Sequence, residues 1–185
     1  MKHLLIALLS IISIATYAQC PVAGSSKEAR LQHLDSLKNR TNVGKKATKM
    51  DVSDFLIGEF DESNVSTNDY VAMTGYIVGC KWGGKETAEC HEADQNSYDI
   101  HIEIAASPDE TDKKKMMVVE MTRFTRNGIA LSDIRELIGK HVVVTGWLFV
   151  DEEHLQNSYD VNPEGDNDWR GTPVEVHPVM SIVQK

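Results

Sequence analysis

Histidines and carboxylates that could hold a divalent metal are spread over the second half of the chain. In YDIHIEIAA (98–106), Asp99, His101 and Glu103 occupy alternate positions and therefore project from one face of an expected strand. The full set of candidate ligands is His91, Asp99, His101, Glu120, His154 and His177. Imidazole and carboxylate together suit zinc or another transition metal, which would activate a bound water. No HExxH and no cysteine pairs at zinc-finger spacing accompany them, so ordinary hydrogen-bonded histidines are the alternative.

A second candidate is a calcium loop in DVNPEGDNDWRG (160–171), which spaces oxygen-bearing side chains much as an EF-hand does. These side chains are Asp160, Asn162, Glu164, Asp166 and Asp168. The pattern departs from an EF-hand because Pro163 intrudes and Gly171 stands where a bidentate glutamate is expected. An ordinary acidic turn rich in Asn, Pro and Gly is the alternative. A divalent metal or calcium is the only cofactor that the sequence suggests.

Aromatic and planar side chains form a third candidate, a ligand-binding groove. Its expected members are Trp82, His101, Tyr159, Trp169 and Arg170. Flat aromatic faces suit sugars or bases, and a guanidinium suits a carboxylate or phosphate. In the alternative interpretation, Tyr159 and Trp169 only hold a long loop against the domain, and Arg170 pairs with a nearby acid.

The elements that must position these residues follow from hydrophobic periodicity and glycine punctuation. Strands are predicted at 70–80, 98–106, 116–124, 141–151 and 172–184, with a short helix at 131–139. This succession is typical of a mainly β fold, a five-stranded OB-like barrel with a helix between its third and fourth strands. Gly75 and Gly146 lie inside two similar strands, where glycine permits the bending that closes a small barrel. An open α+β sheet of the same elements is the alternative.

In an OB barrel the ligand lies between the loop joining strands 1 and 2 and the loop joining strands 4 and 5. Here those loops are residues 81–97 and 151–171. The acidic end of GKHVVVTGWLFVDEEH (139–154) therefore leads into one rim of the expected groove.

The N-terminal part predicts export. Residues 1–18 combine one lysine, an apolar run and small residues at Thr16 and Ala18, as a signal peptide does. Cleavage after Ala18 would give a periplasmic or secreted protein, and lipidation at Cys20 is the alternative. Residues 19–69 are expected to hold an amphipathic helix, with Leu31, Leu34 and Leu37 at helical spacing, and an extended connector. The barrel domain is expected at 70–185, and no mature segment is predicted to cross a membrane.

Charge and cysteine content narrow the function classes. The chain of 185 residues has a formal net charge of −9, which disfavours nucleic acid because Lys and Arg supply most phosphate affinity. In an exported protein, Cys80 and Cys90 are expected to close a disulfide, and a thiolate metal pair is the alternative. Since no GxSxG, P-loop or dinucleotide fingerprint is present, the sequence favours a binding module over an enzyme.

The C-terminal half also resembles a family of small, uncharacterised, exported bacterial proteins. The resemblance lies in GKHVVVTGWLFVDEEH and WRGTPVEVHPVMSIV, which share a Gly-Trp strand, an acidic-His loop, an Arg-Gly-Thr and a closing Glu-x-His-Pro strand. It is strongest over 139–183. Val174 and Val176 flank Glu175 where bulkier residues are expected. The resemblance implies an OB-like fold and no settled activity.

Three function hypotheses follow. The leading one is an exported OB-fold binding or interaction module for a small molecule, a saccharide or a protein. The second is a metal-dependent hydrolase directed at phosphodiesters. The third is a structural or accessory protein whose N-terminal helix docks a partner.

Overall fold

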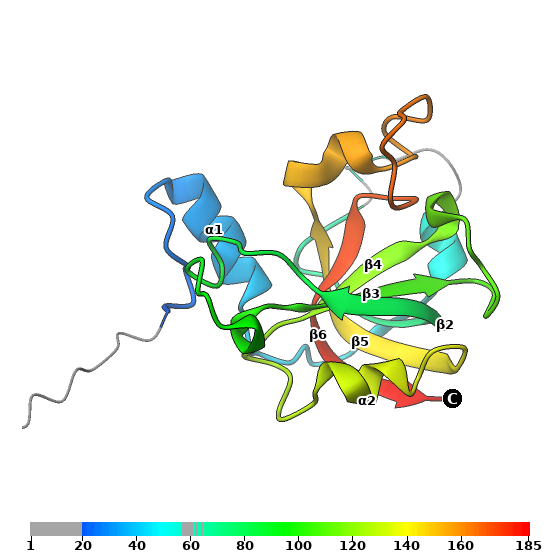
Figure 1. Cartoon of the computed structure of the whole chain (residues 1–185), viewed down its shortest axis with the longest axis horizontal. Helices are drawn as coiled ribbons and strands as arrows, with labels where there is room; N and C mark the ends of the chain where they lie inside the picture. The colour runs from blue at the N-terminus through cyan, green and yellow to red at the C-terminus, as the bar shows by residue number, and fades with distance from the viewer. Residues whose placement is uncertain (1–19, 57–60, 62, 64) are drawn as a thin grey trace, which may run out of the picture.

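The fold of the chain was taken from a computed structural model, which describes residues 20–56, 61, 63 and 65–185. Its centre is a closed five-stranded β-barrel, as the periodicity predicts (Figure 1). The barrel strands are β2 (Tyr70–Trp82), β3 (Ile100–Ala105), β4 (Met117–Met121), β5 (His141–Val150) and β6 (Val174–Gln184). The short helix α2 (Leu131–Arg135) lies between β4 and β5 in the chain, at the predicted position.

The order of the strands around the barrel is β2, β3, β4, β6, β5 and back to β2. The pairings are antiparallel except that between β4 and β6, where Val118 lies opposite Glu175. This order, with the helix between the third and fourth strands, is that of the OB barrel. One further strand, β1 (Thr48–Asp51), runs parallel to β2 within the segment predicted as a connector.

Alternation along the strands separates the inside of the barrel from its outside. Ile100, Ile102 and Ile104 are fully buried in the apolar core, together with inward residues of the other strands. Gly146 sits in β5 at a shift of the β5–β6 register, and a Cβ there would meet the backbone oxygen of Pro178. The strand therefore needs glycine where it bends. Helix α2 lies at the end of the barrel opposite the loop that follows β5 (Figure 1).

The N-terminal helix α1 (Ala29–Lys38) forms within the predicted range, but its most buried side chains are polar. Asp35 and Lys38 are buried, whereas Leu31, Leu34 and Leu37 are only half-buried. Asp35 accepts a hydrogen bond from Thr87, and Lys38 pairs with Glu86, so the helix is fixed to the β2–β3 loop by polar contacts. No helix among the described residues has the length and apolar character needed to cross a bilayer.

The disulfide joins Cys20 to Cys90, so the predicted bond between Cys80 and Cys90 is wrong. Cys80 lies within β2 and is a free thiol. The predicted pairing considered only proximity in sequence, whereas the N-terminal segment folds back onto the β2–β3 loop and brings Cys20 within 5.8 Å of Cys90 between Cα atoms. The predicted signal peptide, residues 1–18, lies outside the described residues.

Candidate functional site

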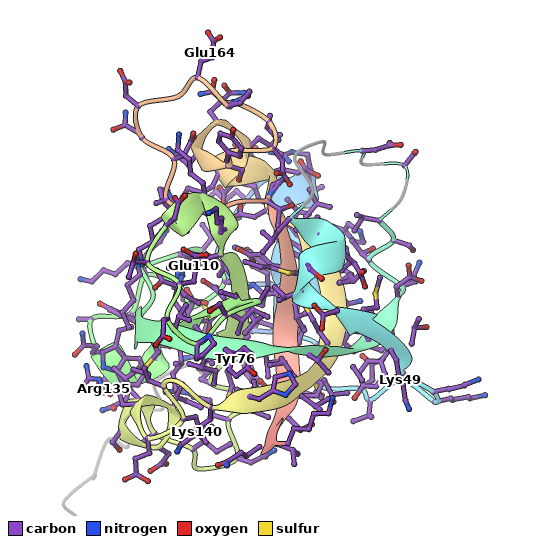
Figure 2. All side chains as sticks on the ribbon, turned by 90° about the vertical axis from the view of Figure 1, so that its right-hand side faces the viewer. Lys49, Tyr76, Glu110, Arg135, Lys140 and Glu164 are labelled. Carbon is purple, nitrogen blue, oxygen red and sulfur yellow. A yellow bond between two sulfur atoms is a disulfide. The ribbon has the colours of Figure 1, made fainter. Side chains whose placement is uncertain are left out.

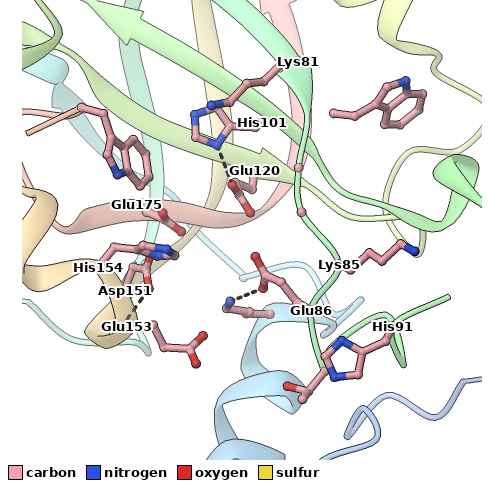
Figure 3. Close-up of a pocket in the computed structure, with 16 residues that line it drawn as sticks. Lys81, Lys85, Glu86, His91, His101, Glu120, Asp151, Glu153, His154 and Glu175 are labelled. Atoms are coloured by element: carbon pink, nitrogen blue, oxygen red, sulfur yellow. Dashed lines mark hydrogen bonds and ion pairs between the residues drawn. The ribbon is translucent and has the colours of Figure 1, made fainter. Parts of the chain in front are cut away.

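A pocket of about 650 Å³ lies between the two loops that the sequence marked as the rims of a groove (Figure 3). The loop after β2 contributes residues 83–87 and His91, and the loop after β5 contributes Asp151, Glu153, His154 and Trp169. Strands supply Lys81, Trp82, His101, Glu120 and Glu175, and α1 supplies Lys38. The pocket therefore occupies the usual ligand position of an OB barrel.

The floor of the pocket is the outer face of β3, β4 and β6. Because the inward positions of these strands are apolar, their polar residues point outward. They are nevertheless buried: His101 is 5 % exposed, Glu175 3 % and His177 0 %. Helix α1 and the two loops cover this face, as the contacts of Lys38 with Glu86 and with the ring of Phe149 show.

A row of three side chains crosses the floor from strand to strand. Lys81 of β2 lies opposite His101 of β3, and His101 lies opposite Glu120 of β4. The His101 Nδ1 donates to Glu120 Oε1 at 2.9 Å, which directs Nε2 away from the carboxylate. That Nε2 is buried and has no hydrogen-bond partner. The row therefore presents an oriented imidazole nitrogen at the pocket (Figure 3).

His177 is the centre of a buried ionic cluster beneath this row. Its Nε2 donates to Asp99 Oδ2 at 3.1 Å, and its Nδ1 lies 3.2 Å from Glu175 Oε2 and 3.5 Å from Glu120 Oε2. Burial lowers the pKa of His177, but the hydrogen bonds to Asp99 and Glu175 outweigh it and raise the pKa to about 10. Burial raises the pKa of Glu120, but the hydrogen bond from His101 and the charge of His177 bring it to about 2.

Arg170 anchors the other side of the cluster. Its side chain is fully buried and pairs with Glu175 Oε1 at 2.5 Å and with Asp151. Asp151 also accepts a hydrogen bond from His154 Nδ1 at 2.7 Å. That hydrogen bond raises the pKa of His154 above its ordinary value, and burial of the ring offsets only part of the increase. Arg170 therefore holds the loop in place, as in the alternative interpretation of the sequence, and does not line the pocket.

The predicted aromatic residues are placed unequally. Trp82 and Trp169 line the pocket, and Tyr159 does not. The Trp169 ring is held by Arg170 at 4.2 Å and by Lys81 at 5.7 Å from its centroid. Tyr159 lies under Lys114. Trp82 is partly buried, and the Arg126 guanidinium lies 5.2 Å from the centroid of its ring.

The predicted metal ligands separate into a floor group and a rim group. Asp99, Glu120 and His177 offer ligand atoms within 4.8 Å of one another, and no other such group of His, Cys, Asp or Glu occurs in the described part of the chain. His91 and His154 line the pocket outside this group.

The predicted calcium-loop residues lie above the barrel, and Glu164 is at the tip of the loop, pointing away from it (Figure 2). Asp160 is half-buried, and burial raises its pKa to about 6. Asn162 donates to the backbone of Gln156, Asp166 is exposed, and the Asp168 carboxylate lies 3.8 Å from Lys114 Nζ. Their carboxylates do not form a group of three within 4.8 Å among the described residues. The calcium site stays a prediction.

Sequence reasoning did not single out Lys38 or Glu175, and it placed Asp151 only within the acidic end expected at the rim of the groove. Lys38 lies in the expected N-terminal helix, and Glu175 lies in the expected closing strand. A signal for Glu175 existed, since VEVHP places Glu175 and His177 on the same face of a strand, where two charged neighbours need partners. Nothing in the sequence indicates that α1 folds over that face.

The β2–β3 loop that carries the rim is bent sharply. Cys90 and His91 have φ values of 56° and 51°, in the left-handed region that non-glycine residues rarely adopt. The disulfide to Cys20 and the hydrogen bond from the His91 amide to the Glu86 carbonyl, at 2.9 Å, hold this turn. This rim of the pocket is therefore held in a defined conformation and is joined covalently to the N-terminal segment.

Comparison with known proteins identifies a family but no activity. No curated protein and no solved structure is similar to the chain. The family described as a domain of unknown function, DUF6359, matches residues 50–149, from within β1 to within β5. The resemblance noted in the sequence lies in residues 139–183, and the family match overlaps that segment only at its start. Both comparisons point to an uncharacterised family. Because the match covers more than half of the chain, the protein belongs to the DUF6359 family.

Proposed function

We propose that the protein is a binding module for a short, neutral saccharide, held in the pocket between the β2–β3 and β5–β6 loops. The observation that carries this proposal is the pocket itself, whose volume of about 650 Å³ falls in the range of small-molecule sites, about 300–1,000 Å³. Its position at the OB groove supports the same function class.

The lining matches the chemistry of hydroxyl groups, which donate and accept at once. Glu86, Glu120 and Glu153 offer acceptors, and Lys81 and Lys85 offer donors (Figure 3). The tryptophan Trp82 gives an apolar face for the C–H side of a sugar ring. An anionic polymer is disfavoured because five carboxylates line the pocket and the chain carries −9.

Titration calorimetry and tryptophan emission test this function with cellobiose, maltose, xylobiose and diacetylchitobiose at millimolar concentration. We expect one disaccharide to bind and change the emission, because two of the three tryptophans line the pocket. Trp82→Ala should weaken binding about five- to tenfold, since a lost stacking face costs roughly 1–1.5 kcal/mol.

Trp147→Phe is the matched control. Trp147 contacts the ring of Tyr70 at a tilted angle and lies beneath Arg40, outside the pocket lining, so its substitution should leave the affinity unchanged. Absence of heat and of an emission change with all four sugars would overturn the saccharide proposal, and so would equal loss of binding in both variants.

We also propose that the protein acts outside the cytoplasm. The Cys20–Cys90 disulfide supports this location, because such bonds persist in oxidising compartments. It also bears on the lipidation alternative, since the Cys20 sulfur cannot form both a disulfide and a lipid thioether. The intact mass of the native protein tests both: a chain starting at Gln19 with one disulfide is expected, and a lipid-modified Cys20 would contradict it.

A further inference from the structure

We propose that Asp99, Glu120 and His177 bind one divalent transition-metal ion at the floor of the pocket. This site goes beyond the saccharide proposal and does not depend on it. The ligand atoms of the three residues lie within 4.8 Å of one another. Within that group, Asp99 Oδ2 is 3.1 Å from His177 Nε2, a separation close to that between two donors that share one metal ion with bonds about 2.0–2.2 Å long. Because one imidazole nitrogen binds one ion, His177 Nε2 would be the metal ligand, and Nδ1 would keep its contact with Glu175 Oε2 at 3.2 Å.

Two buried polar atoms beside the group have no partner. Asp99 Oδ1 and His101 Nε2 make no hydrogen bond, although their side chains are only 5 % and 6 % exposed. An unpaired polar atom at such depth costs free energy, and each is an electron-pair donor of the kind that a cation accepts. His101 lines the pocket and is held through Glu120, one of the three proposed ligands.

The charge balance of the interior favours a cation in the same place. Three buried carboxylates, Asp99, Glu120 and Glu175, lie around His177, and the buried Arg170 divides its charge between Glu175 and Asp151. Buried carboxylates are stable when they are paired or when they coordinate a metal. A divalent ion would take the place of the proton that links His177 to Asp99 and would bring one further positive charge to these carboxylates.

The scaffold and the donor set indicate which metals would bind. Asp99 precedes β3, Glu120 lies on β4 and His177 on β6, so three adjacent strands fix the ligands. Two carboxylates with one imidazole, and a second imidazole nearby, suit Zn²⁺ or Mn²⁺ better than the all-oxygen sites of Ca²⁺ or Mg²⁺. Of the three ligands, Glu120 also lines the pocket, so the ion would lie directly beneath the pocket floor.

The test uses the protein with its Cys20–Cys90 disulfide formed, purified without chelators or metal-affinity resin. It is stripped with EDTA, dialysed, and titrated with Zn²⁺ or Mn²⁺ while metal content and melting temperature are followed. We expect one ion per chain. At a hundredfold excess over Kd the melting temperature should rise by about 5–10 °C for a chain of this size. Less than about one tenth of an ion per chain, with an unchanged melt, would overturn the proposal and leave an ion-paired network.

Variants locate the site. Asp99→Asn should lower the metal affinity at least tenfold, and His101→Gln offers a second test if Asp99→Asn does not fold. His154→Gln is the matched control. Like His101, His154 lines the pocket and is hydrogen-bonded to a carboxylate, that of Asp151, but it lies outside the three-residue metal group. Loss of metal in His154→Gln with retention in Asp99→Asn and His101→Gln would place the ion at the rim and overturn the proposal. Sugar binding by metal-free protein keeps the two proposals separable.

Discussion

Glu89 lies in the β2–β3 loop, is 2 % exposed, and its Oε1 has no hydrogen-bond partner. Burial raises its pKa to about 8, and the negative charges of Asp99 and Glu86 add to this effect. Lys38 and His177 act in the opposite direction. The carboxyl group is therefore protonated in the folded protein at pH values where it is ionised in the unfolded chain.

This difference makes the free energy of unfolding depend on pH. The contribution of Glu89 is fully present below pH 4.5, its ordinary pKa, and is lost as pH rises through about 8. We expect Glu89→Gln to be more stable than wild type at pH 8.5 by more than about 1 kcal/mol, and nearly equal to it at pH 4.5. Urea unfolding at both pH values measures this. Glu136→Gln, at an exposed site, is the control, and equal behaviour of both variants would contradict the prediction.

Arg170 is the residue whose loss should cost most. It is fully buried between Asp151 and Glu175, and its removal leaves two carboxylates without their cation. We expect Arg170→Met to lower the free energy of unfolding by about 3–5 kcal/mol, as for other broken buried pairs. Chemical denaturation checks the value. A loss below about 1 kcal/mol would show that other groups neutralise Asp151 and Glu175, and it would contradict the prediction.

At the scale of elements, the rim of the pocket depends on the bond between the N-terminal segment and the β2–β3 loop. The disulfide spans 70 residues, for which the chain-entropy relation gives a stabilisation of about 4 kcal/mol. Cys20→Ser and Cys90→Ser should each lose about this amount in urea unfolding, and the double variant should lose no more. Cys80→Ser, which leaves the bond intact, should behave as wild type, and a loss there equal to that of Cys90→Ser would contradict the assignment.

The elements were predictable to the extent that their pattern was local. The strands follow from alternation such as that of Ile100, Ile102 and Ile104, and the bend at Gly146 follows from a glycine inside an apolar run. Strand β1 was missed because its four residues, Thr48–Asp51, carry no alternation and pair only through β2. The partner of Cys90 was missed for a similar reason, since it depends on a fold-back of the N-terminal segment.

The candidate site was predictable only in part, because a sequence shows which residues face outward but not what covers them. Asp99 and His101 were expected on one face of a strand; Asp99 lies just before β3, and both side chains are buried beneath α1 and two loops. Lys38 joins the site because α1 lies over this face and pairs with Glu86, 48 residues later in the chain. Glu175 joins it because β6 pairs with β4, where Glu175 lies opposite Val118.

At the scale of the whole molecule, charge excludes one class of partner. With a net charge of −9 and a carboxylate-rich pocket, the protein should not bind single-stranded DNA at about 0.15 M salt. Fluorescence anisotropy with a labelled oligonucleotide measures this. Binding that weakens steeply as salt is added would reveal a local basic surface and contradict the prediction. The hypothesis of a metal-dependent hydrolase requires a bound metal ion, so the Zn²⁺ and Mn²⁺ titration described above tests it.

The residues matched by the family do not include all the strands of the barrel. The DUF6359 match ends within β5, at residue 149, whereas β6 closes the barrel by pairing with both β4 and β5. A fragment cut at 50–149 would thus present two unpaired sheet edges and would lack Lys38, His154 and Glu175. Expression trials that follow the family borders should therefore yield aggregates, whereas a fragment that continues through β6 keeps both sheet edges paired.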